Sequence, residues 1–411
     1  MKKLLSLLFS ILLVSCLAFS VTACGDAEES KSGSTEAIAP ITYNFKLEED
    51  DDGNKTYTLT DFTLSEEAKE FVDDEDWDGL AKLFNRKVST EIKGEKTYSS
   101  ASVRVLELPD QWGKEGERYP VTKIAESALA NQVFIKELIV PASVVEIELG
   151  AFSGLSSLEK ITLPFIGSKL GAKNNAKLFG YVFGTIGGTN LTSITQTYND
   201  GSENNTTAFY IPSSLRTVVI TGKVGATAGE VYSYYISDDN EMIVVDEEHP
   251  APDGKEVFTT EGDDRFLCYD ESALQPYAFH SVSMIETVVF EGEITAIPEY
   301  AFYGCGFKSL DFTDSGIVEI GKNAYANCTS LKYVTFGTVT AIKDNAFNGC
   351  TVLGENTKTT VNVLDLSLVT EIGEGAFVGT SADEDSVVFH ADVTEDDKKS
   401  AFGEDFIADE E

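Results

Sequence analysis

Residues 320–334 read Ile-Gly-Lys-Asn-Ala-Tyr-Ala-Asn-Cys-Thr-Ser-Leu-Lys-Tyr-Val, and the apolar positions of this run recur along the 411-residue chain. At its centre stands an alanine followed by an aromatic residue or leucine. Such pairs occur at Ala128-Leu129, Ala151-Phe152, Ala278-Phe279, Ala301-Phe302, Ala324-Tyr325, Ala346-Phe347 and Ala376-Phe377. Their separations are 23, 127, 23, 23, 22 and 30 residues, which indicates a repeat of about 23 residues.

The neighbours of each pair recur as well. Four positions before the alanines stand Ile124, Ile147, Leu274, Ile297, Ile320, Ile342 and Ile372. Further on come alternating triplets at 138–140, 161–163, 288–290 and 334–336, and Leu310 with Phe312 takes the same place in the Ala301 repeat. A period of two predicts a short strand in each repeat.

A unit of this size cannot bury its own apolar face, whereas stacked units bury a continuous one. We therefore predict a β-rich α/β solenoid with short parallel strands about 4.8 Å apart. Alanine is expected where the backbone turns tightly against its neighbour, and phenylalanine where the width of the core must be filled.

The run from Ile320 to Val334 resembles the BspA-like leucine-rich repeat of bacterial surface proteins, whose pattern is Ile-x-x-x-Ala-Phe-x-x-Cys-x-x-Leu-x-x-Val. The resemblance covers about residues 119–390. It implies a leucine-rich-repeat array that contacts host matrix proteins, host cells or other bacteria, with adhesion as the outcome.

The array departs from this register in the middle. We predict insertions at 184–210 and 222–272 within a repeat region at 119–390, and a smaller one near 355–360. Strand-like runs at 231–236 and 242–245 suggest β-structure in the second insertion. Residues 41–118 are expected to form an N-terminal cap, with a helix in 65–87, and residues 391–411 an acidic C-terminal cap or tail.

The first residues, Met1-Lys2-Lys3 followed by an apolar run to Ala23, read as an export signal; a permanent membrane anchor is the alternative. Val21-Thr22-Ala23-Cys24 resembles the bacterial lipobox, which implies cleavage after residue 23, a lipid on Cys24 and a flexible tether at 24–40. Cys16 also fits the box, but cleavage there would leave an apolar start. We expect an exported, cell-surface lipoprotein that meets the membrane through its lipid only.

The formal net charge of −38 makes nucleic acid a poor partner. Its simplest effect is solubility, and an attraction for basic ligands or loosely held divalent cations is the sharper alternative.

Three cysteines, Cys305, Cys328 and Cys350, share one repeat position. Their spacing of 23 and 22 is not a zinc pattern, so we expect a column of core thiols, with a disulfide between neighbours left open. Asp74, Asp76, Asp78 and Gly79 match half of a calcium loop, yet Asn85 stands where a bidentate glutamate is required. An acidic turn between two helices is the preferred interpretation, and calcium binding stays open.

No catalytic motif is present, and His249, His280 and His390 stand at unrelated repeat positions. We therefore predict no enzyme and no cofactor. Aromatic residues gather in or beside the two insertions: Tyr198, Phe209, Tyr210, Tyr232, Tyr234, Tyr235 and Tyr269. They suit a binding surface, or they pack the insertions onto the array.

Three functions remain open: binding and adhesion through an extracellular protein or glycan ligand; a surface hydrolase or carbohydrate-binding lipoprotein that uses residues 168–272; and a structural envelope protein. The ligand, its binding residues and the oligomeric state are not predicted by the sequence.

Overall fold

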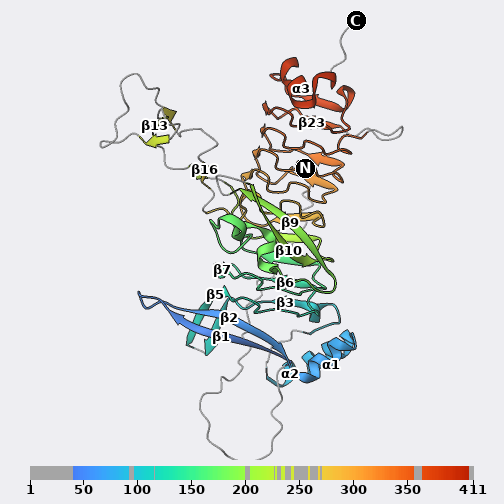
Figure 1. The fold of residues 1–411 in the computed structure, drawn as a ribbon. Coiled ribbons are helices and arrows are strands. Elements are labelled where there is room, and N and C mark those ends of the chain that lie inside the picture. The colour runs from blue at the N-terminus through green and yellow to red at the C-terminus, as the bar shows by residue number, and fades with distance from the viewer. Residues whose placement is uncertain are drawn as a thin grey trace, which may run out of the picture.

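The computed structural model describes residues 40–91, 97–114, 116–199, 204–225, 271–355 and 363–406, together with five short strands between residues 227 and 268. The repeats follow one another along the molecule (Figure 1). Helices α1 (Glu66–Asp73) and α2 (Trp77–Glu91) lie at one end and α3 (Glu395–Phe402) at the other. Most of the regular structure is β-strand.

The alternating triplets form a first parallel ladder, in which a strand of one repeat pairs with a strand of the next. Leu138 lies beside Ile161, and Val218 beside Val288, so the central residues stack inside. The ladder runs through β3 (Val105–Glu107), β6 (Glu137–Ile139), β8 (Lys160–Leu163), β11 (Thr217–Ile220) and β17 (Thr287–Phe290). The same pairing continues in β19 (Ser309–Asp311) with β21 (Tyr333–Thr335), and in β23 (Leu364–Leu366) with β25 (Val387–Phe389). The predicted strands are confirmed to within a residue.

The aliphatic residue before each alanine lies in a second parallel ladder. Ile320 stands beside Ile297 on one side and Ile342 on the other, and Ile342 stands beside Ile372. The strands are β18 (Ala296–Ile297), β20 (Glu319–Ile320), β22 (Ala341–Ile342) and β24 (Glu371–Ile372), and β5 (Glu117–Ile124) pairs with β7 (Glu146–Ile147) in the same way.

The alanine-aromatic pairs close the space between the two ladders. The backbone N–H of Phe302 donates to the carbonyl of Ala324, and that of Tyr325 to the carbonyl of Ala346, at 2.9 and 2.8 Å. The buried rings stack face to face, with centroids 5.3–5.5 Å apart from Phe279 through Phe377. The alanines of these repeats therefore lie in one continuous core.

Two left-handed residues frame each pair. One directly precedes the alanine: Ser127, Gly150, Tyr277, Tyr300, Asn323, Asn345 and Gly375. The other follows it by three positions: Asn131, Gly154, Ser281, Gly304, Asn327, Gly349 and Gly379. Their φ angles lie between 53° and 78°, a region that glycine and asparagine enter with the least strain.

The three cysteines form a column beside the rings. All are buried free thiols. The Sγ of Cys328 donates to the carbonyl of Phe302 at 3.3 Å, and that of Cys350 to the carbonyl of Tyr325 at 3.2 Å. Each thiol thus packs as a small apolar group and satisfies a carbonyl of the preceding repeat. The predicted thiol column is confirmed.

The N-terminal residues form a sheet in the strand order β1 (Ile41–Glu49), β2 (Lys55–Leu64), β5 and β4 (Gln111–Lys114). Asp50 closes the hairpin turn between β1 and β2, since its Oδ1 accepts from the N–H groups of Asp52 and Asn54. The acidic turn between two helices is confirmed: Asp76 accepts from the N–H of Gly79 at 2.8 Å and begins α2, which buries Leu80.

The insertions contain regular structure. Strands β9 (Leu191–Asn199) and β10 (Asn204–Pro212) pair as a long antiparallel hairpin, which the sequence did not reveal. In the second insertion β13 (Ser233–Ile236) pairs with β14 (Met242–Val244) and β15 (Phe258–Thr259), and β12 (Thr227–Ala228) pairs with β16 (Leu267–Cys268). The turn expected at 238–240 lies outside the described residues.

Candidate binding surface

The residues on either side of an alanine-aromatic pair are more exposed than the pair itself in most repeats. In most repeats they are small: Ser127 and Ala130, Gly150 and Ser153, Asn323 and Ala326, Asn345 and Asn348. In the two repeats that follow the insertions they are Tyr277 with His280 and Tyr300 with Tyr303. We call these four residues the tyrosine flank.

The four rings form two stacked pairs. Tyr277 lies on Tyr300 with centroids 4.6 Å apart and an interplanar angle of 10°, and His280 lies on Tyr303 at 4.5 Å and 7°. Within each repeat the two rings are 5.9 Å apart. Tyr277 is only 6% exposed, whereas the other three are half-buried and form an aromatic surface of two repeats by two positions.

Two of the tyrosines hold a strained backbone. Tyr277 has φ 68° and Tyr300 has φ 53°, at the position where five other repeats have serine, glycine or asparagine. A bulky residue in the left-handed region is an outlier that costs free energy, and such residues cluster at functional sites. Since smaller residues give the same turn elsewhere, the turn alone does not explain these rings.

The β9–β10 hairpin borders the flank. Gln196 of β9 is fully buried; its side chain accepts from the N–H of Gly180 at 2.7 Å and donates to the carbonyl of Ala278 at 3.0 Å. Phe209 of β10 is also buried and forms a small apolar cluster with Leu178 and Tyr277, against which Tyr198 packs. The hairpin is therefore fixed to the repeat that carries Tyr277.

Polar groups surround the four rings, and the rings of His280 and Tyr300 are themselves uncharged at pH 7. Burial lowers the pKa of His280 to about 4, so its imidazole is neutral at pH 7, and its Nδ1 lies 2.8 Å from the hydroxyl of Ser281. Burial, with Glu299 nearby, raises the pKa of Tyr300, so its phenol stays protonated. Tyr303 accepts from Asn327 at 2.5 Å, and Lys177 lies 5.2 Å from the Tyr277 ring centroid. The surface offers rings and hydrogen bonds to a ligand.

The aromatic residues singled out from the sequence divide between the two roles. Phe209 packs the hairpin, while Tyr198 and Tyr210 are half-buried at its surface. Tyr234 and Tyr235 lie on β13, and Tyr232, Tyr269 and His249 lie outside the described residues. The sequence analysis missed the tyrosine flank, although aromatic residues at two positions that are small in the other repeats were a visible signal.

Other predicted residues lie elsewhere. Cys24 and Cys16 are outside the described residues. Asp76 caps α2, and within the described part of the chain no group of three or more His, Cys, Asp or Glu residues is placed to hold a metal ion. No helix in the described ranges has both the length and the apolar character needed to cross a membrane.

The chain belongs to the family whose repeat is described as the BspA type leucine rich repeat region. Six copies match, over residues 122–234 and 272–403. A comparison with curated proteins finds no match.

The chain also matches solved structures of bacterial proteins at low sequence identity. A leucine-rich cell surface protein from Faecalibacterium prausnitzii A2-165 is 15% identical, with 89% of this chain and 78% of that chain covered and a TM-score of 0.28. The leucine-rich repeat protein of T. pallidum is 16% identical, with 84% and 96% covered and a TM-score of 0.31. The pneumococcal vaccine antigen PcpA is 14% identical, with 89% and 83% covered and a TM-score of 0.23.

Proposed function

We propose that the chain is a lipid-anchored surface protein that binds an extracellular protein or glycan and so mediates adhesion. In this proposal the repeats form a solenoid, residues 41–118 and 391–411 cap its two ends, and Cys24 carries the lipid. Membership of a family whose proteins are often surface adhesins supports a binding role over a catalytic one.

The tyrosine flank is the observation that carries the proposal. Tyrosine gives a large, rigid contact with a polar tip, and it is enriched where proteins bind ligands. Here Tyr277 and Tyr300 occupy backbone positions that disfavour them, beside a hairpin held by the buried Gln196. The proposed ligand contacts the outer edges of Tyr300, Tyr303 and His280.

Binding arrays test the ligand. The mature chain, with Cys24→Ser to remove the lipid, is applied to arrays of matrix proteins and of glycans. A double variant, Tyr300→Asn with Tyr303→Ala, gives this repeat the Asn323 and Ala326 of the next one and should preserve the fold while abolishing retention. Tyr333→Ala is the matched control, because Tyr333 is 48% exposed on β21, away from the flank. Retention that is blank, or unchanged in the double variant, would overturn the assignment.

A separate experiment tests the anchor. Cells that express the full chain are fed an alkyne-tagged palmitate, and the chain is examined for the label. Cys24→Ser should abolish the label and release the protein, while Cys16→Ser should leave both unchanged. A label that survives Cys24→Ser would contradict the anchor without affecting the ligand assignment.

A further inference from the structure

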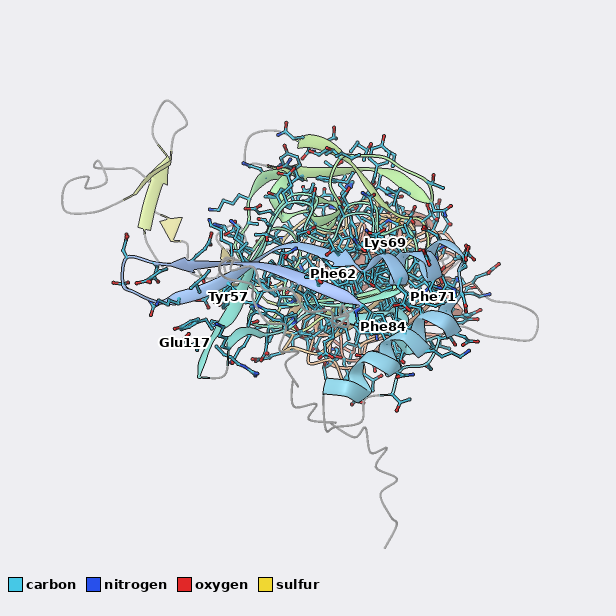
Figure 2. All side chains as sticks on the ribbon, turned by 90° about the horizontal axis from the view of Figure 1, so that it is seen from below. Tyr57, Phe62, Lys69, Phe71, Phe84 and Glu117 are labelled. Carbon is cyan, nitrogen blue, oxygen red and sulfur yellow. The ribbon has the colours of Figure 1, made fainter. Side chains whose placement is uncertain are left out.

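The N-terminal sheet extends beyond the repeats, so part of the face that packs on the core is not covered by them. On β2 the inner face consists of Leu59 and Phe62, which are buried, and Tyr43 of β1 meets Phe62 edge-on at 5.3 Å. Side chains alternate along a strand, so Tyr57 continues the face that Leu59 begins. Figure 2 shows β1 and β2 extending beyond the part of the molecule that holds Phe62 and Phe84, with Tyr57 and Glu117 on this extension.

Aromatic residues from four strands meet on the extension. Phe45 of β1 lies 4.6 Å from Trp112 of β4 and 5.9 Å from Tyr57 of β2, and Tyr57 lies 6.3 Å from Tyr119 of β5. All four rings are half-buried, and Leu47 beside them is 46% exposed. Tyr57, Trp112 and Tyr119 do not belong to the hydrophobic core of the described residues. We call these four aromatic residues the aromatic platform.

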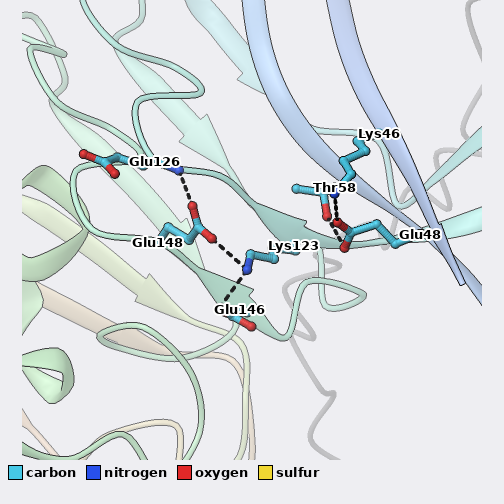
Figure 3. Close-up of polar contacts among 7 residues, drawn as sticks. All are labelled: Lys46, Glu48, Thr58, Lys123, Glu126, Glu146 and Glu148. Carbon is cyan, nitrogen blue, oxygen red and sulfur yellow. Dashed lines mark hydrogen bonds and ion pairs between the residues drawn. The ribbon is translucent and has the colours of Figure 1, made fainter. Parts of the chain in front are cut away.

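The opposite face of the sheet is polar (Figure 3). Glu48 accepts from Lys46 and from Thr58, while Lys123 pairs with Glu146 at 3.1 Å and Glu148 at 2.7 Å. The sheet therefore has one face that is satisfied by ion pairs and one that offers rings to solvent. An exposed apolar patch with a polar rim marks an interaction site.

Two lysines beside the platform each have an acidic neighbour, in a protein whose formal net charge is −38. Lys55 lies 3.7 Å from Glu49 and 5.9 Å from the Tyr119 ring centroid, and Lys114 stands opposite Glu117 in the register of β4 and β5. Three consecutive aspartates, at 50–52, occupy the turn at the tip of β1 and β2 and repel a polyanion or an anionic membrane. These charges disfavour an anionic ligand and supply hydrogen-bonding groups beside the rings.

The rings of the platform are tilted to one another by 33–69°, and charged hydrogen-bonding groups lie beside them, an arrangement that suits one kind of ligand. A pyranose ring has faces rich in C–H groups, which pack on aromatic rings, and an edge of hydroxyl groups, which bond to carboxylates and ammonium groups. A protein anchor, by contrast, is usually held in a well-packed, desolvated pocket.

We propose that the aromatic platform binds a neutral, β-linked polysaccharide, whose sugar rings stack on Trp112, Tyr57 and Tyr119. The site is distinct from the tyrosine flank and does not depend on the ligand that the flank takes. Lys55, Glu49, Lys114 and Glu117 supply hydrogen bonds to the sugar hydroxyls.

Tryptophan fluorescence tests the proposal, because the chain has only two tryptophans. Trp77→Phe in the mature Cys24→Ser chain leaves Trp112 as the only reporter. Titration with cellohexaose and with chitohexaose should shift its emission, and calorimetry should give matching affinities. Tyr57→Ala and Tyr119→Ala should each weaken binding by about tenfold or more, as expected for central aromatic contacts. Trp112→Ala, followed by calorimetry, should abolish it.

The controls separate the alternatives. Tyr333→Ala and the double variant Tyr300→Asn, Tyr303→Ala should bind both hexasaccharides normally, even if flank binding fails. Circular dichroism and urea midpoints establish that each variant is folded. Absence of binding to both sugars, or full binding by Trp112→Ala, would overturn the proposal. Trp112-dependent sedimentation with phosphatidylcholine vesicles, or Trp112-dependent dimers in gel filtration, without sugar binding, would assign the platform to a lipid surface or a second copy instead.

Discussion

The ring of Phe402 lies on that of Phe377 with centroids 4.7 Å apart and an interplanar angle of 10°. The N–H of Phe377 also donates to the carbonyl of Ala401 at 2.8 Å. Helix α3 thus presents an alanine and a phenylalanine to the last repeat as a further repeat would.

Phe402→Ala should lower the free energy of unfolding by about 3 kcal/mol, the cost of emptying a buried aromatic site. Urea denaturation of the mature Cys24→Ser chain measures it. Val388→Ala is the control, because Val388 is 48% exposed and its loss should change stability by less than about 0.5 kcal/mol. Equal effects of the two changes would show that α3 does not complete the core.

The thiol column should be chemically inert while the protein is folded. Burial raises the pKa of Cys305 and of Cys328, which suppresses the reactive thiolate. Iodoacetamide at pH 8 should therefore modify none of Cys305, Cys328 and Cys350 without denaturant, and all three in urea. Peptide mass spectrometry reads each site, and rapid labelling of any of the three in the folded chain would contradict the burial.

The left-handed position before each alanine should tolerate glycine but not a β-branched residue, and the two substitutions should therefore differ in their effect on stability. At Asn345, where φ is 55°, a β-branched residue is strongly disfavoured. Asn345→Val should reduce stability by about 1–3 kcal/mol, whereas Asn345→Gly should change it little. Thermal and urea unfolding of both variants measure the difference, and a valine variant as stable as the glycine variant would refute the conformational explanation.

The hairpin beside the tyrosine flank should detach when Gln196 loses its amide. Gln196→Leu leaves the N–H of Gly180 buried without this partner, at a cost of about 1–3 kcal/mol, while the carbonyl of Ala278 keeps the N–H of Phe179 as a donor. Hydrogen exchange in β9 and β10 should quicken while exchange in β20 and β22 stays unchanged. If the amides of β9 and β10 exchange as slowly in the variant as in the unchanged chain, Gln196 does not hold the hairpin.

Acid should weaken the fold through His280. Its pKa is about 4 in the folded chain and about 6.5 when unfolded, so the unfolded chain binds a proton first as the pH falls. The contribution of the neutral ring is complete above about pH 6.5 and is lost as the pH falls toward 4. His280→Gln should make the free energy of unfolding less dependent on pH in this range. An identical slope in the variant would exclude His280 as the source.

The repeats were predictable because a given position of the repeat has the same surroundings in every copy, so the same type of residue recurs there. The alternating residues at 138–140 belong to a strand that pairs with the corresponding strand of the next repeat. Cys328 and Cys350, 22 residues apart, likewise occupy the same position in neighbouring repeats. The β9–β10 hairpin was not predictable, since its strands are rich in threonine and asparagine and Gln196 forms its key bonds with residues 16 and 82 positions away. The tyrosine flank was missed for a different reason: its residues stand outside the apolar pattern of the repeat, and the left-handed backbone that makes Tyr277 and Tyr300 unusual is visible only in the structure.

The hydrogen bonds between successive aromatic and alanine residues give the array a direction. From Phe279 to Phe377, the N–H of the aromatic residue in each repeat donates to the carbonyl of the alanine in the next repeat, and Ala401 of α3 accepts the last of these bonds. Adding or removing one whole unit between Phe347 and Ala376 would leave both ends with the neighbours they already have. A chain built in this way can therefore gain or lose one repeat at a time without redesign of either terminus.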